Sequence, residues 1–123
     1  MSGAAEDGVR VVRDGGGEAY DAPGHHDVVG RALHAPALGG PPGFRVAHST
    51  FLPGARVDPS ANPGHTVYVV LDGAIELGVG ESTWTLERGD SVHLPPGTVR
   101  TVRNDGDRPA VVLVVAETPR EDA

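Results

Sequence analysis

The sequence of 123 residues contains no cysteine and no lysine. Without cysteine there can be no disulfide, no thiolate nucleophile and no zinc site built on cysteine. All 10 basic residues are arginine, and 17 acidic residues outnumber them, which gives a formal net charge of −7. A basic surface for nucleic acid is therefore not expected. Proteins that bind nucleic acid are the first class that the composition excludes.

Long apolar runs are also missing. The longest covers residues 110–116, far below the ~18 residues that a membrane span needs. The first eight residues lack a basic segment followed by an apolar one, so we expect no secretory signal, no membrane partner and a cytoplasmic protein. Residues 1–8 and 117–123 show no apolar period, and we predict that they are disordered ends of one barrel domain at 9–116.

Glycine and proline are abundant, with 18 and 11 residues respectively. They interrupt the chain every few residues, which disfavours long helices and favours short strands joined by turns. Asp72-Gly73 and Asn104-Asp105-Gly106 are typical of tight turns between strands. This spacing predicts an all-β sandwich or barrel. The predicted strands are residues 9–13, 27–34, 44–51, 66–71, 74–79, 82–86, 91–94, 98–103 and 110–116.

Two glycine-bounded patterns lie in the second half of the chain. The first opens at Gly54 and closes at Gly73, and the second contains Gly89, Pro95, Gly97 and Asn104. In their spacing they resemble the two sequence motifs of the cupin superfamily. The resemblance covers residues 53–115 directly. It implies a cupin-type double-stranded β-helix barrel made of two facing antiparallel sheets.

The chain departs from that family at the metal ligands. The resemblance places two histidines, a glutamate and a third histidine at four positions that here hold Ser60, Asn62, Thr66 and Arg100. Neutral hydroxyl and amide groups are poor ligands for a transition metal. Arg100 offers no lone pair, and a unit charge ~4 Å from a cation costs about 4 kcal/mol at an effective dielectric of ~20. The chain therefore resembles the metal-independent members of the family, and we expect no metal and no cofactor.

An arginine that points into a barrel needs an anion. We predict that Arg100 receives a carboxylate, phosphate or enolate oxygen of a small-molecule ligand. The alternative is that Arg100 is solvated at the rim or pairs with an acid such as Asp58 or Asp90. The predicted substrate-binding residues are Ser60, Asn62, Thr66 and Arg100.

The predicted catalytic residues are His48, His65, His93 and Tyr68. Histidine transfers protons near neutral pH, and a buried tyrosine hydroxyl can orient a ligand or donate a proton. We expect all four at one pocket, with His65 at its edge. A relocated metal site of the three histidines is an alternative, although no pair of them has a metal-motif spacing. His25 and His26 are predicted to be solvated loop residues.

The sequence therefore predicts an enzyme that performs acid/base chemistry on a small anionic or carbonyl-containing molecule. Family members without metal include dehydratases, isomerases, epimerases and cyclases of specialised metabolism. The motif positions hold no pair of carboxylates of the kind a glycosidase uses. A non-catalytic ligand sensor or carrier is the second reading, and a cupin metalloenzyme is the third. We also expect a homodimer, because Val67, Val69 and Leu71 form an apolar face on one strand.

Overall fold

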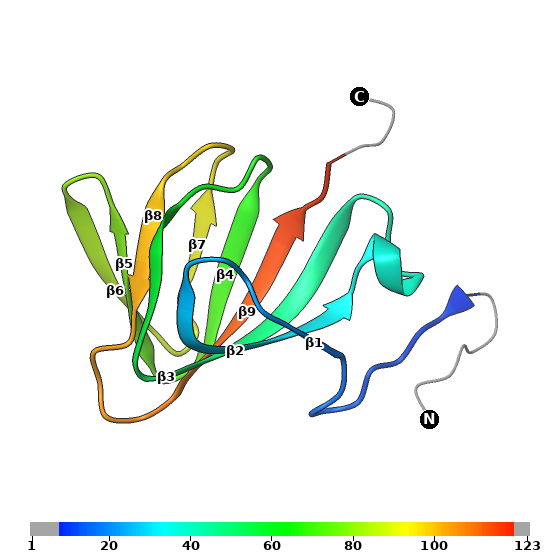
Figure 1. Ribbon diagram of the computed structural model, residues 1–123, viewed down its shortest axis with the longest axis horizontal. Helices are drawn as coiled ribbons and strands as arrows, with labels where there is room; N and C mark the ends of the chain where they lie inside the picture. Colours follow the sequence, from blue (N-terminus) through cyan, green and yellow to red (C-terminus); the bar gives the residue numbers. More distant parts are fainter. Residues whose placement is uncertain (1–7, 120–123) are drawn as a thin grey trace.

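The computed structural model describes residues 8–119, which form a rolled, almost purely β structure (Figure 1). Within that range, no helix is long and apolar enough to cross a membrane. The predicted disordered ends fall largely on residues 1–7 and 120–123, which lie outside the described residues. The elements are β1 (Glu18–Tyr20), β2 (His25–His34), the 3₁₀ turn η2 (Pro36–Leu38), β3 (Phe44–Ser60), β4 (Thr66–Asp72), β5 (Ala74–Val79), β6 (Ser82–Glu87), β7 (Ser91–Leu94), β8 (Arg100–Arg103) and β9 (Ala110–Glu117).

The strands pair antiparallel in the order β6-β5-β8-β3-β9-β4-β7, and β2 and β1 add to the free side of β3. These pairings make one continuous sheet, and the long strand β3 belongs to both halves of it. Its first part, residues 44–51, pairs with β9, whereas residues 56–60 pair with β8. The two halves form the facing sheets of the barrel and enclose an interior (Figure 1). The predicted all-β barrel of two facing antiparallel sheets is therefore confirmed.

Strand β3 passes from one sheet to the other at Pro53-Gly54, which the sequence predicts to be a break between strands. Gly54 has a φ of 85°, a left-handed conformation that glycine adopts without a steric penalty. Its N–H donates to the Asn104 carbonyl oxygen at 2.9 Å. The expected break is therefore a bend within one continuous strand.

The N-terminal strands differ from the prediction. Residues 9–13 do not form a strand; only Arg10 makes an isolated bridge. The sequence missed β1, which has three residues and follows three glycines. Strand β2 begins at His25 rather than at Asp27, so His25 and His26 lie in a strand and not in a loop. Asp27, which has a φ of 58°, lies where the β2–β3 register is interrupted.

The hydrophobic core lies between the two sheets. Leu77, Val102, Val112 and Ile75 are at most 2% exposed. The last three also line a cavity in the interior. The core therefore forms a wall of that cavity, and side chains on the inner faces of the strands decide what the cavity contains.

Candidate functional site

A cavity of about 330 Å³ lies inside the barrel. Its walls come from the inner faces of β3, β4, β5, β8 and β9, and residues 20–25 at the junction of β1 and β2 border it on one side. Tyr20 is held in this border because it packs on Gly30, where a Cβ would come within 2.9 Å of the tyrosine ring. The volume is at the lower end of the ~300–1,000 Å³ typical of small-molecule sites.

Arg100 is the central charged group of this cavity. It is only 5% exposed, and it begins β8 beside the end of β3. Its Nε donates to Tyr68 Oη at 2.9 Å, and its Nη1 donates to the Ser60 carbonyl oxygen at 2.8 Å and to Ser60 Oγ. All these partners are neutral. Within residues 8–119, no carboxylate lies within ion-pair distance of Arg100.

The second terminal nitrogen of Arg100, Nη2, makes no hydrogen bond with the described residues. Every fully enclosed side-chain nitrogen or oxygen in that part of the chain has a hydrogen-bond partner. Because Nη2 has no such partner, it is not fully enclosed, and solvent-sized groups can reach it. The proposed acid partners of Arg100 are engaged elsewhere: Asp58 contacts His26 and Arg56, and Asp90 accepts from the Glu87 N–H. The arginine therefore has donors available for a ligand.

The other predicted binding residues lie around Arg100. Ser60 and Asn62 line the cavity. Thr66 is 1% exposed and does not line it, but its Oγ1 accepts a hydrogen bond from Asn62 Nδ2 at 2.8 Å. Because Thr66 fixes the donor group of the Asn62 amide, the Asn62 oxygen remains available to accept a hydrogen bond. Thr66 therefore positions a cavity residue.

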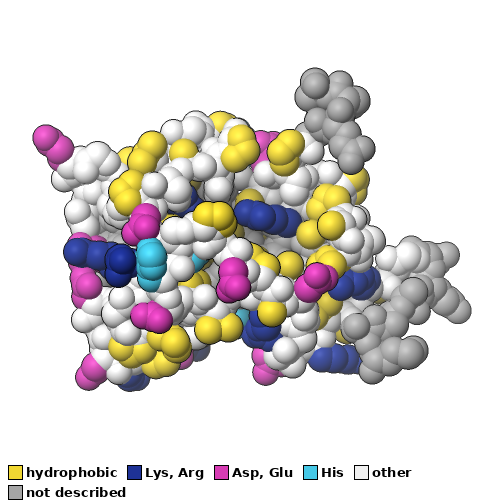
Figure 2. All heavy atoms as spheres, in the orientation of Figure 1, with side chains coloured by type: hydrophobic (Ala, Val, Ile, Leu, Met, Phe, Trp, Pro, Cys, Tyr) yellow, Lys and Arg dark blue, Asp and Glu magenta, His cyan; other side chains and the backbone are white. Residues whose placement is uncertain are grey.

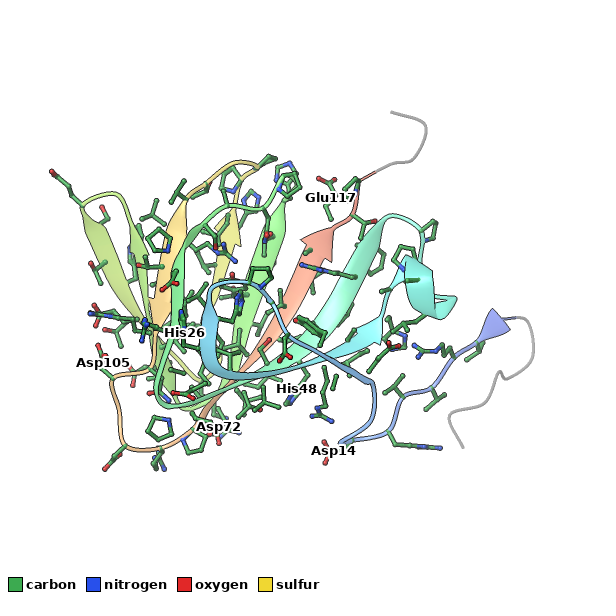
Figure 3. The ribbon with its side chains drawn as sticks, in the orientation of Figure 1. Asp14, His26, His48, Asp72, Asp105 and Glu117 are labelled. Carbon is green, nitrogen blue, oxygen red and sulfur yellow. The ribbon has the colours of Figure 1, made fainter. Side chains whose placement is uncertain are left out.

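The structure does not place His48 in the cavity. In β3 the inward positions are Ala47 and Ser49, and His48 has the opposite phase. Its Nδ1 lies 3.2 Å from Arg31 Nη2 on the outer face of the sheet, below the β2 ribbon in Figure 3. The expectation that His48 lines the pocket is therefore wrong, because strand alternation points it outward.

His65 and His93 are also outside the cavity, and both are exposed. His93 pairs with Val67 across β4 and β7 and shares the outward face with it. His65 Nδ1 lies 2.9 Å from His93 Nε2, and the rings stack with centroids 5.1 Å apart. The structure thus brings these two histidines together, but at the surface and away from Arg100.

The sequence analysis missed five residues with polar side chains that line the cavity. Ser49 shares the inward phase of Ala47 and Phe51, a signal that alternation could have given. The segment before β2 is irregular, so no periodicity in the sequence indicates that it borders the barrel. In the space-filling view, basic side chains lie among hydrophobic ones on the face turned toward the reader (Figure 2). The missed residues are Tyr20, Asp21, His25, Arg45 and Ser49.

The residues at the motif positions do not fit a metal ion. The guanidinium of Arg100 is surrounded there by a phenol, a serine and an amide, and none of these is a preferred transition-metal ligand. Within residues 8–119, no group of three or more histidine, cysteine, aspartate or glutamate side chains is arranged to hold a metal. The three-histidine arrangement is not formed, because His48 lies with Arg31 and not with His65 and His93.

Residues 47–116 match the family model of the cupin domain, which is more than half of the chain. The chain belongs to the cupin family. It is 35% identical over 111 residues to a protein named β-D-galactosidase from Mycobacterium tuberculosis, covering 90% of this chain and 96% of that protein.

Solved structures support the same assignment of the cupin fold. The polyketide cyclase RemF from Streptomyces resistomycificus superimposes with a TM-score of 0.81 at 20% identity, over 92% of this chain and 82% of that one. A cupin superfamily protein from Desulfitobacterium hafniense gives a TM-score of 0.65 at 17% identity, over 75% and 78% of the two chains. At these identities the likeness concerns the fold alone.

Proposed function

We propose that this cupin is an enzyme that binds a small carboxylate or carbonyl compound in the barrel and transfers a proton on it without a metal. The observation that carries the proposal is the buried Arg100, whose Nη2 donors are free and which has no acid partner within residues 8–119. A buried cation without a counter-ion is costly, and a bound anion or a developing oxyanion relieves that cost.

Tyr68 is the proposed proton donor. Its Oη accepts a hydrogen bond from Arg100 Nε, so its own hydrogen remains available to an oxygen of the ligand. Arg100 Nη2 and the Tyr68 hydroxyl would then bind the same carbonyl or enolate oxygen. Removing a proton from the carbon next to that carbonyl places negative charge on this oxygen, and these two donors would stabilise it.

His25 is the proposed base, in place of the three histidines expected from the sequence. It lines the cavity, and its Nδ1 lies 3.1 Å from the Pro23 carbonyl oxygen. A carbonyl oxygen only accepts, so Nδ1 carries the hydrogen and the neutral ring has its lone pair on Nε2. This nitrogen would take the carbon-bound proton and return it to another position of the substrate. Isomerases, cyclases and dehydratases all use such a step.

The test follows a panel of 2-oxo and 3-oxo acids by NMR in D₂O. We expect wild-type protein to bind one or more of them and to exchange the proton next to the carbonyl. His25→Gln should slow exchange by about 10²–10⁴-fold with little change in affinity, and Arg100→Gln should weaken binding, whereas Arg103→Gln should do neither. The proposal fails if no binding depends on Arg100. Arg100-dependent binding without exchange would instead indicate a non-catalytic ligand sensor or carrier.

A galactosidase activity is the second candidate, because of the relative that carries that name. Most glycosidases need two carboxyl groups on opposite sides of the scissile bond. Asp21 is the one acidic residue among the described residues that line the cavity. We therefore expect no hydrolysis of 4-nitrophenyl β-D-galactoside. Hydrolysis that is lost in Asp21→Asn would favour this candidate over proton transfer.

The cytoplasmic location and the homodimer also stay predictions.

A further inference from the structure

Arg45 is a second arginine in the same cavity. It lies on β3 with the inward phase of Ala47 and Ser49, and it lines the cavity together with Arg100. Arg45 is exposed, whereas Arg100 is buried. The cavity therefore has one arginine at its solvent side and one in its interior.

Neither arginine is neutralised by the protein. In the part of the chain that the structure describes, Arg45 makes no side-chain hydrogen bond and has no carboxylate within ion-pair distance. The charged residues that line the cavity are these two arginines and Asp21. In a protein with a formal net charge of −7, this cavity is locally positive. Two guanidinium groups facing one small space repel each other unless an anion lies between them.

The two arginines enter the cavity from opposite ends of β3. Arg45 is near the start of β3 and opposite Ala116 of β9, whereas Arg100 is opposite Ser60 at the end of β3. Because they come from these separate places and line one cavity, the two groups are placed to hold the two ends of a ligand rather than one group together. The same cavity is also lined by apolar side chains, among them Val112 and Val114, which suit a short carbon chain.

We propose that the ligand is a small dicarboxylate, with one carboxylate on Arg100 and the other on Arg45. This inference rests on the proposed function, in which Arg100 binds the reacting end of the ligand, and it adds the substrate class. Arg45 is then a specificity-determining residue that selects compounds with a second acidic group.

The experiment measures dissociation constants by calorimetry for succinate, glutarate and adipate, and for the matched monocarboxylates butanoate, pentanoate and hexanoate. For wild-type protein we expect at least one dicarboxylate to bind about tenfold more tightly than its monocarboxylate, as a charged hydrogen bond would give. Arg45→Gln should abolish this preference and leave the monocarboxylate affinity unchanged. Arg100→Gln should weaken both classes. Arg31→Gln, on the outer face, is the matched control and should change neither.

The outcomes separate the two proposals. If Arg100→Gln weakens both classes but wild-type protein has no preference, or the preference survives in Arg45→Gln, only the dicarboxylate inference is overturned. If the affinities do not depend on Arg100, or no carboxylate binds, the proposed function fails and the inference fails with it.

Discussion

Strand β8 carries two arginines in opposite electrostatic surroundings. Arg103 points outward, where its Nη2 donates to Glu76 at 2.7 Å and lies 3.4 Å from Asp105. The hydrogen bond to Glu76 and the charge of Asp105 raise the pKa of Arg103 above its ordinary value. Arg100 points inward, and its partners are a phenol, a hydroxyl and a carbonyl oxygen.

The difference concerns charge balance. Outside the barrel the carboxylates of the protein itself balance the charge of Arg103. Inside the barrel the described residues fix the orientation of Arg100 through neutral acceptors and leave its charge unmatched. A purely structural arginine in a low-dielectric interior gains most from a carboxylate partner. Because the side chain of Arg100 is held in place while its charge has no counter-ion among the described residues, it is suited to an anionic ligand.

The largest expected effect is a loss of folding stability from a substitution in the core, away from the ligand site. Leu77 is 0% exposed and lies opposite Val102 on the inner face that also carries Arg100. Leu77→Ala should lower the free energy of unfolding by about 2–5 kcal/mol because it leaves a cavity in the core. Denaturant unfolding measures this loss. Ser49→Ala, at the cavity wall, is the control, and an equal loss in both variants would contradict the division into core and site.

Replacing the two β8 arginines tests the comparison directly. Arg100→Met should weaken carboxylate binding by about 1.5–3 kcal/mol. It should change the free energy of unfolding by only about 1 kcal/mol, because the lost hydrogen bonds are offset by removal of a buried charge. Arg103→Met should leave binding unchanged. Calorimetry and denaturant unfolding of both variants supply the measurements. Early unfolding of Arg100→Met with unchanged affinity would make Arg100 a structural residue.

The sequence predicted most of the barrel because glycine and proline mark its turns. The bounds of β5 and β7 are those expected, and the motif spacing identified Ser60, Asn62 and Arg100 at the cavity. The missed β1 and the bend in β3 have separate causes. A three-residue strand is too short to show a period, and Pro53-Gly54 is equally compatible with a loop or a bulge.

The positions of the histidines differ from the prediction for another reason. The chemistry of a histidine indicates what its side chain can do, whereas strand phase decides which face it lies on. Alternation along β3 sends His48 to the outer face once Ala47 and Ser49 face inward. His25 and Arg45 could not be recognised as lining the same cavity as Arg100, because only the pairing of β2 and β8 with β3 brings those segments together.

The outer face of β4 offers a further contrast with the interior. Val67 and Val69 are half-buried, and Leu71 is 42% exposed. We predict that a second copy of the chain covers this face. Leu71→Asp should then weaken the dimer by about 1.5–3 kcal/mol, the value for burying a leucine side chain. Sedimentation equilibrium measures the association, with Glu81→Gln as a surface control. A wild-type mass equal to that of the monomer would contradict the homodimer.

The smallest expected effect concerns the ion pairs on the outer surface. Asp58 accepts a hydrogen bond from His26 at 2.9 Å and lies 3.5 Å from Arg56. Its pKa is lowered from 3.8, chiefly by the hydrogen bond with His26; burial opposes this shift, and the charges of His26 and Arg56 add smaller lowering effects. A carboxyl with a lowered pKa in the folded state stabilises that state above its unfolded pKa, and this contribution is lost as the pH falls through the folded value.

Asp58→Asn should therefore lose less stability than wild-type protein between about pH 5 and about pH 2. Melting temperatures across that range measure the difference, with Asp107→Asn as the control. If the melting temperatures of wild-type protein and Asp58→Asn fall in parallel with pH, the His26–Asp58 contact does not contribute to folding stability. The outer ion pairs would then not differ from the unpaired arginines of the cavity in their effect on stability.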